Sequence, residues 1–112
     1  MSILVNINNI GGSITKEDDR YTVKDNTLLD NLVVSSTDLK PMKSTSGHNH
    51  KGQEEVYQFV SGNGTMVVGT ELHLVGPNDV VLIPDGEFHR VSNTSKYEDL
   101  IFVCVFDGKR SH

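Results

Sequence analysis

The sequence is short of cysteine and of positive charge, and both shortages limit what the protein can be. Cys104 is the single cysteine, so no disulfide can form within the chain, which suits a reducing compartment. The 15 Asp and Glu residues outnumber the 10 Lys and Arg residues, and no basic cluster occurs. With a formal charge of -5, the chain is a poor partner for nucleic acid or for an anionic membrane.

Long apolar runs are also missing. No stretch of ~18 apolar residues is present that could cross a bilayer. The start, MSILVNINNIGG, lacks the basic segment, the long apolar core and the cleavage site of a signal peptide. We therefore expect a cytoplasmic protein with no membrane partner.

Helical spacing of apolar residues over ~10 or more positions is absent, whereas short β-rich runs recur between turn residues. The length of 112 residues suits one domain, so the sequence predicts a single all-β sandwich or barrel over residues 1–112. Residues 1–25 are expected to form an N-terminal strand at Ile3 to Ile7 and the polar connector ITKEDDR, and residues 32–106 to form the barrel proper. The other predicted strands are YTV, LLDNLVVSSTDL, EEVYQFV, TMVVG, ELHLV, DVVLIP, HRVSN and LIFVCVF.

The last predicted strand, Leu100 to Phe106, is apolar at every position, so both of its faces need cover. Cys104 lies inside it, where a buried structural thiol is expected. One arrangement covers the second face with the N-terminal segment of the same chain. We favour a homodimer in which this strand or Ile3 to Ile7 meets its symmetry mate.

The segment GHNHKGQEEVYQFVSGNG gathers side chains that bind metals. In a strand, residues two apart point to the same side, so His48 and His50 can present both imidazoles to one point. A third histidine, His89, follows the turn PDGEFH, in which Pro84 fixes one backbone angle and Gly86 can supply a positive one. This turn would bring His89 onto a neighbouring strand. The alternative is that all three are ordinary surface residues in loops.

Two glutamates offer a fourth ligand, and they lie on opposite faces of the next predicted strand. Glu55 shares its face with Tyr57 and Phe59, whereas Glu54 shares its face with Val56. An interior lined by aromatic side chains favours Glu55. Three imidazoles and one carboxylate suit one divalent transition metal per chain, such as Mn, Fe, Co, Ni, Zn or Cu.

Together these residues resemble the cupin superfamily of small β-barrels, which carry two short motifs. The first is a glycine, five residues, His-x-His, three or four residues, Glu, six residues and Gly. The second is a glycine, five residues, Pro-x-Gly, two residues, His, three residues and Asn. The chain matches the first motif at His48, His50, Glu55 and Gly62, and the second at Pro84, Gly86, His89 and Asn93.

The resemblance implies a jelly-roll or double-stranded β-helix barrel, and its spacing selects Glu55 rather than Glu54 as the ligand. The chain departs from the motifs where their leading glycines would stand. Asn78 replaces one, and asparagine tolerates a left-handed backbone. Met42 replaces the other and suggests a different turn. Neither departure touches a predicted metal ligand.

The resemblance further implies a metal-dependent protein acting on a small polar molecule, and the style of the motifs favours a sugar or sugar-phosphate isomerase or epimerase. Tyr57 and Glu54 are the candidates for the base that such a reaction needs. An Fe(II)-dependent oxygenase and a non-catalytic small-molecule binding protein are the alternatives, because fold alone does not select a reaction. His73 and His112 match neither motif. His73 is expected at the surface or in a second layer around the site, and His112 is expected in solvent.

Overall fold

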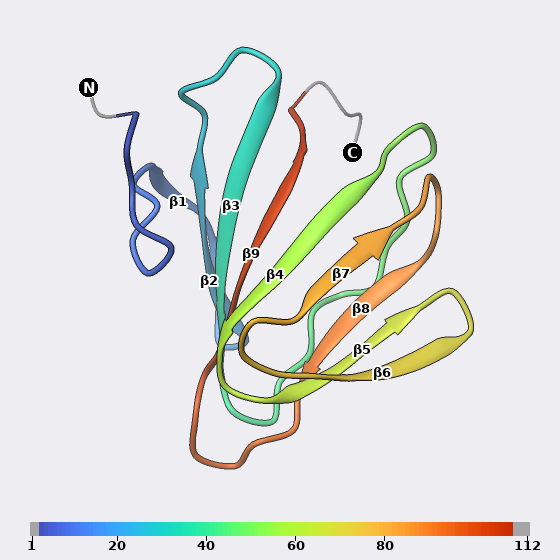
Figure 1. The fold of residues 1–112 in the computed structure, drawn as a ribbon. Helices are drawn as coiled ribbons and strands as arrows, with labels where there is room; N and C mark the ends of the chain where they lie inside the picture. The colour runs from blue at the N-terminus through green and yellow to red at the C-terminus, as the bar shows by residue number, and fades with distance from the viewer. Residues whose placement is uncertain (1–2, 109–112) are drawn as a thin grey trace.

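The computed structural model describes residues 3–108, so His112 lies outside the described residues. Every regular element in this range is a β-strand, and no helix in it is long and apolar enough to cross a membrane (Figure 1). The strands are β1 (Ser13–Glu17), β2 (Tyr21–Asn26), β3 (Leu32–Leu39), β4 (Glu55–Ser61), β5 (Gly64–Val68), β6 (Glu71–Val75), β7 (Val80–Ile83), β8 (His89–Asn93) and β9 (Leu100–Asp107).

The strands form two antiparallel sheets, which confirms the predicted all-β fold. One sheet has six strands in the order β1-β2-β3-β9-β4-β7, and the other has three in the order β6-β5-β8. In Figure 1, β2, β3, β9 and β4 converge at one end and fan apart at the other, with the three-stranded sheet beside them. Apolar side chains from the inner faces of both sheets make the core, which includes Leu39, Met66, Val91 and Leu100.

Alternation of side chains sets which residues of β4 reach the interior. Glu55, Tyr57 and Phe59 are buried, while the residues between them are half-buried on the opposite face. The rings of Tyr57 and Phe59 each lie 5.4 Å from the ring of Phe102 on β9, which anchors β4 to the centre of the sheet. The predicted face of β4 is therefore confirmed, with Glu55 inside.

Strand β9 is paired on both edges, with β3 on one side and β4 on the other. Cys104 is buried on its inner face, as predicted for a structural thiol. Burial raises the pKa of this thiol to about 12. Cys104 therefore stays protonated and unreactive at neutral pH.

Two predictions for the first residues were wrong. The segment from Ile3 to Ile7 forms no regular strand, and the range 3–9 contains only an isolated bridge between Asn6 and Asn9. Conversely, most of the supposed connector ITKEDDR lies in β1, which pairs with β2 although all five of its residues are exposed. Backbone hydrogen bonds stabilise an edge strand without any apolar face, so hydrophobic alternation does not reveal it.

The two positions that depart from the glycines of the motifs both have a left-handed backbone. The φ angle is 63° at Met42 and 74° at Asn78. The different turn expected at Met42 is therefore not reflected in its φ angle, which has the hand that glycine adopts without strain. Only the side chain departs from the motif. The Met42 side chain is 60% exposed, so little packing compensates for this conformation.

Replacing Met42 with glycine should stabilise the protein. Removal of the Cβ relieves the left-handed strain at the expense of a more flexible unfolded chain, and we expect a net gain of about 1 kcal/mol. Thermal unfolding should then show a midpoint raised by about 4 °C. Met42→Ala is the matched control, because it removes the same side chain but keeps the Cβ. Equal midpoints for both variants would show that the backbone at this position is not strained.

Candidate metal centre and ligand cavity

A pair of backbone hydrogen bonds brings the first two predicted ligands together. His89 opens β8, and His48 lies opposite to it in an isolated antiparallel bridge. The two residues exchange N–H···O bonds of 3.2 and 3.0 Å. Their ring centroids are consequently only 4.7 Å apart.

The other two predicted ligands lie beside this pair. The ring of His50 is 4.7 Å from that of His48 and 6.4 Å from that of His89. Oε2 of Glu55 lies 3.3 Å from Nε2 of His89, and both side chains are buried. We call these four residues the His/Glu cluster. The expected strand through His48 and His50 is not present, because only His48 is bridged, so the pairing with β8 rather than strand alternation gathers the histidines.

The hydrogen bond made by the other ring nitrogen of His89 fixes its tautomer. Nδ1 lies 3.0 Å from the carbonyl oxygen of Glu87. A carbonyl only accepts, so Nδ1 carries the proton and, in the neutral ring, Nε2 carries the lone pair. Burial lowers the pKa of His89, which favours this neutral ring. The lone pair is therefore directed toward the carboxylate of Glu55.

This arrangement sets two acceptor atoms against each other in a buried place. A lone pair on nitrogen and a carboxylate oxygen at 3.3 Å repel unless a proton or a metal ion lies between them. The donor set therefore fits a divalent cation. Within residues 3–108, no group of three or more His, Cys, Asp or Glu side chains yet has the spacing of metal ligands. The fit to a cation therefore rests on the chemistry of the four donors and on the contact between Glu55 and His89.

A cavity of about 160 Å³ extends from His48 toward the first two strands. His48 belongs both to its wall and to the His/Glu cluster, and the ring of Tyr57, another wall residue, lies 5.6 Å from that of His89. We call it the donor cavity, after the polar groups that line it. Its other polar lining residues are Lys16, Tyr21, Thr37, Thr45 and Ser46, and its apolar lining residues are Val23, Phe102 and Cys104.

Sequence reasoning missed most of this wall. Lys16 was assigned to a connector, yet it lies in β1 opposite Val23 of β2, which is itself opposite Thr37 of β3. The register of the three strands therefore places these residues in one row across the sheet. Alternation along residues 21–26 indicates which of these side chains share a face. It identifies the wall of the donor cavity only after the pairing of β1 with β2 is known.

The two candidates for a base lie in different surroundings. Tyr57 is buried against the ring of His89, and burial raises its pKa well above the usual range. It therefore stays protonated and can donate a hydrogen bond into the donor cavity. Glu54 is exposed and lines a different cavity of about 630 Å³, whose wall also includes Glu55 and Asp85.

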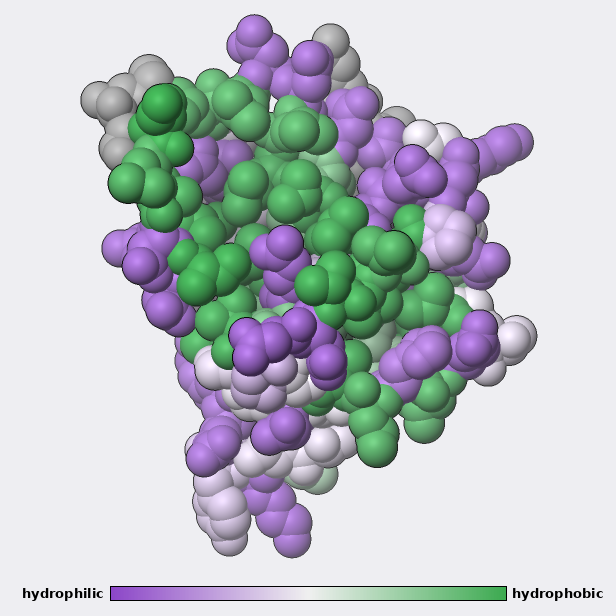
Figure 2. Space-filling view, in the orientation of Figure 1, coloured by the Kyte–Doolittle hydropathy of each residue, from purple (hydrophilic) through white to green (hydrophobic). Residues whose placement is uncertain are grey.

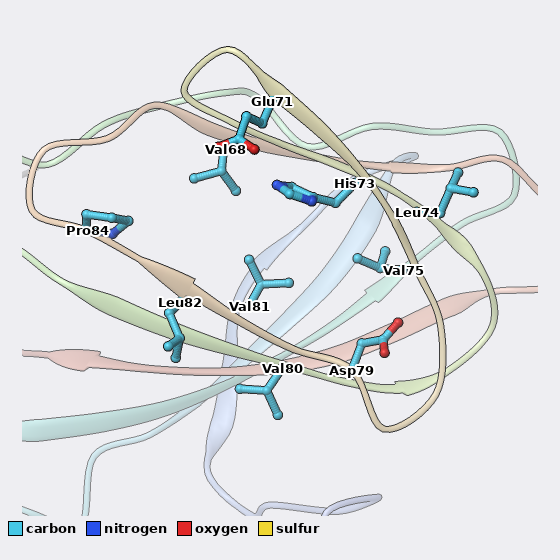
Figure 3. Close-up of a pocket in the computed structure, with 10 residues that line it drawn as sticks. All are labelled: Val68, Glu71, His73, Leu74, Val75, Asp79, Val80, Val81, Leu82 and Pro84. Atoms are coloured by element: carbon cyan, nitrogen blue, oxygen red, sulfur yellow. The ribbon is translucent and has the colours of Figure 1, made fainter.

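A further cavity lies away from the His/Glu cluster. It has a volume of about 430 Å³ and lies between the edge strands β6 and β7 (Figure 3). The imidazole of His73 points into it, beside Glu71 and Val81. His73 is exposed, as expected for a histidine outside both motifs.

The last residue of the second motif, Asn93, has a structural role. Its side chain is buried, and Nδ2 donates to the carbonyl oxygens of Leu39 and Glu98 at 3.0 and 2.8 Å. Its Oδ1 accepts from the backbone N–H of Ser95 at 3.0 Å. Asn93 thus ties the end of β8 to β3 and to the loop before β9.

The geometry agrees with comparisons to known proteins. Residues 36–106 match the family described as Cupin domain. An uncharacterized protein of Streptomyces coelicolor is 35% identical over 68 residues, which are 61% of this chain and 63% of that protein. The chain therefore spans less than two thirds of the length of this relative.

Solved structures show the same fold. A conserved protein with a double-stranded β-helix domain from Klebsiella pneumoniae has a TM-score of 0.83 at 17% identity, over 99% of this chain and 95% of that one. The polyketide cyclase RemF from Streptomyces resistomycificus has a TM-score of 0.80 at 22% identity, over 100% of this chain and 83% of that one. At these identities the likeness concerns the fold alone.

Replacing Asn93 with aspartate should destabilise the fold strongly, although the side chain keeps its shape. Two donors are lost, and a carboxylate is left facing two carbonyl oxygens, so we expect a loss of about 3 kcal/mol in the free energy of unfolding. Urea unfolding measures it. Asn63→Asp, at an exposed position, is the control and should change stability by less than about 0.5 kcal/mol. Similar losses in both variants would contradict the anchoring role of Asn93.

Proposed function

The chain belongs to the cupin family, and on that premise we propose that it is a metal-dependent protein acting on a small polar metabolite. His48, His50, Glu55 and His89 would hold one divalent transition metal. The observation that carries this proposal is the 3.3 Å approach of Nε2 of His89 to Oε2 of Glu55. Two further imidazoles beside these acceptors supply a donor set typical of first-row metals.

A bound divalent ion would polarise a carbonyl or hydroxyl oxygen of the substrate and make a neighbouring proton easier to remove. The chain's own residues supply the rest of the site. Phe102 excludes water from one wall of the donor cavity, and the protonated Tyr57 donates a hydrogen bond to a substrate oxygen. Glu54 would accept a proton only from a substrate that reaches the other side of Glu55.

The reaction class that we favour is an isomerase- or epimerase-like proton transfer, with a sugar or sugar phosphate as the class that the motifs suggest. Proteins of the same fold include an enzyme, the polyketide cyclase RemF. A non-catalytic binding protein is the second candidate. It is supported by the lining of the donor cavity, to which residues 3–108 contribute no carboxylate that could act as a base. Tyr57 stays protonated there, so it cannot act as the base either.

The two neighbouring glutamates give a direct test of the metal centre. Purified without an affinity tag, the protein should contain about one divalent transition metal per chain by elemental mass spectrometry. Glu55→Gln should lose most of it, because a neutral amide oxygen replaces the charged donor. The matched control Glu54→Gln should keep its metal, since Glu54 points away from the cluster. The opposite pattern, or a wild-type protein that never retains a metal, would contradict the assignment.

The outer face of the six-stranded sheet supports a second proposal, that the protein is a homodimer. The strand register aligns Val34, Val105, Val56 and Leu82 in one row across β3, β9, β4 and β7. Figure 2 shows a continuous hydrophobic surface over these strands. Leu82 is 69% exposed on it, and burying such a row against its symmetry mate is the common way for a homodimer to form.

A charge placed on this row should prevent the dimer. Leu82→Lys puts a lysine on the outer face, where a symmetric contact would bring two like charges together, and we expect at least tenfold weaker self-association. Tyr97→Lys is the control, because Tyr97 is 89% exposed in the loop before β9. Light scattering distinguishes the outcomes. A monomeric wild-type protein at high micromolar concentration, or equal weakening by both variants, would exclude this interface.

A further inference from the structure

We infer that the donor cavity binds a short-chain organic carboxylate, with the acid group held near Lys16, Tyr21 and Ser46 and the rest of the molecule directed toward His48. This inference rests on the proposed function, because the inner end of the ligand would meet the proposed metal centre. It narrows the small polar metabolite to a compact anion, which differs from the sugar or sugar phosphate that the motifs suggest.

The charge of the cavity wall is the first observation. Among residues 3–108, Lys16 is the one ammonium or guanidinium group that lines the donor cavity, and no Asp or Glu of this range lines it. Such a wall is exceptional in a chain that carries a formal charge of -5. The Asp25 carboxylate lies beyond the wall, close enough to Cys104 to raise the pKa of its thiol, but it does not line the cavity. Because a cation on a wall that carries no carboxylate from the described part of the chain attracts an anion, the wall favours a negatively charged ligand.

The orientation of the hydroxyl groups is the second observation. Arg20 donates to Oγ of Ser46 at 2.7 Å and to the hydroxyl oxygen of Tyr21 at 3.0 Å. Each oxygen therefore already accepts a hydrogen bond, which leaves its own proton to be donated. Asp18 holds the guanidinium of Arg20 in place through contacts to both carboxylate oxygens.

Two more lining hydroxyls follow the same pattern. Oγ1 of Thr45 accepts from the backbone N–H of Val91 at 3.1 Å, so its proton is also left to be donated. Tyr57 lines the cavity as well, and its phenolic hydroxyl is a hydrogen-bond donor. The cavity thus presents several O–H donors and one ammonium. A ligand made of acceptors satisfies this wall, and a carboxylate has the acceptor lone pairs to do so.

The size of the cavity limits the rest of the ligand. The donor cavity has a volume of about 160 Å³. This is below the ~300 Å³ at which pockets for larger organic ligands begin. A short hydroxy acid or oxo acid fits such a volume, with its carbon atoms against Val23 and Phe102. A sugar phosphate would fill it and extend into solvent.

Calorimetry on the metal-loaded, full-length protein tests the inference with lactate as the probe and lactamide as its neutral counterpart. The two differ in charge but hardly in size. We expect lactate to bind at least tenfold more tightly than lactamide, since a hydrogen bond to a charged group is stronger than one to a neutral group. Equal affinity for both, or no saturable binding of lactate, would overturn the inference.

Variants locate the binding. Lys16→Met should weaken lactate binding about tenfold or more and leave lactamide binding unchanged. Lys24→Met is the matched control, because Lys24 lies on β2 next to Val23 and therefore on the opposite face of the strand. Tyr21→Phe, which removes only a hydroxyl, should weaken lactate binding without affecting the fold. Unchanged lactate affinity in Lys16→Met, or an equal loss in Lys24→Met, would contradict the proposed site.

Metal content measured on the same samples separates this inference from the proposed function. A protein that retains its metal but binds lactate no better than lactamide would overturn the carboxylate ligand and leave the metal centre standing. A wild-type protein that holds no metal, yet binds lactate in a manner that depends on Lys16, would overturn the metal centre and support the anion site.

Discussion

The backbone bridge between His48 and His89 is the contact on which the site depends. It ties the irregular segment of residues 40–54 to the first residue of β8, and it makes two imidazoles neighbours. Glu55 begins β4 a few residues later, and the pairing of β4 with β7 and β9 places its carboxylate beside His89. Two hydrogen bonds between residues 41 positions apart thus bring the donors together, and ordinary sheet packing holds the rest of the chain around them.

The surroundings of His89 divide into two electrostatic halves. On one side, Glu55 and Nε2 of His89 direct lone pairs at each other, which calls for a cation. On the other side, the donor cavity is lined by Lys16 and by the hydroxyls of Tyr21 and Ser46, which accept from Arg20 and so can donate, and this calls for an anion. A metal ion and an acidic ligand side by side would satisfy both halves. This complementarity links the metal centre to the class of its ligand.

The local parts of the fold follow from local rules. Side chains alternate along β4, so the choice of Glu55 over Glu54 required only the positions of Tyr57 and Phe59. The apolar run of β9 is likewise visible in the sequence. Its inner face packs in the core, and its outer face carries Val105 in the apolar row across the six-stranded sheet. The polar strand β1 was missed because it is held by backbone hydrogen bonds, which leave no hydrophobic pattern.

The sequence by itself determined the fold class, most of the strands from β2 to β9 and the membership of the His/Glu cluster, because motif spacing and alternation with period two are local properties of a chain. Only the tertiary structure decided that His48 pairs with His89, that Asn93 anchors three segments and that Lys16 reaches the donor cavity. These three facts depend on strand pairing between residues far apart in the sequence. Such pairing is set by the packing of whole sheets, which no short pattern records.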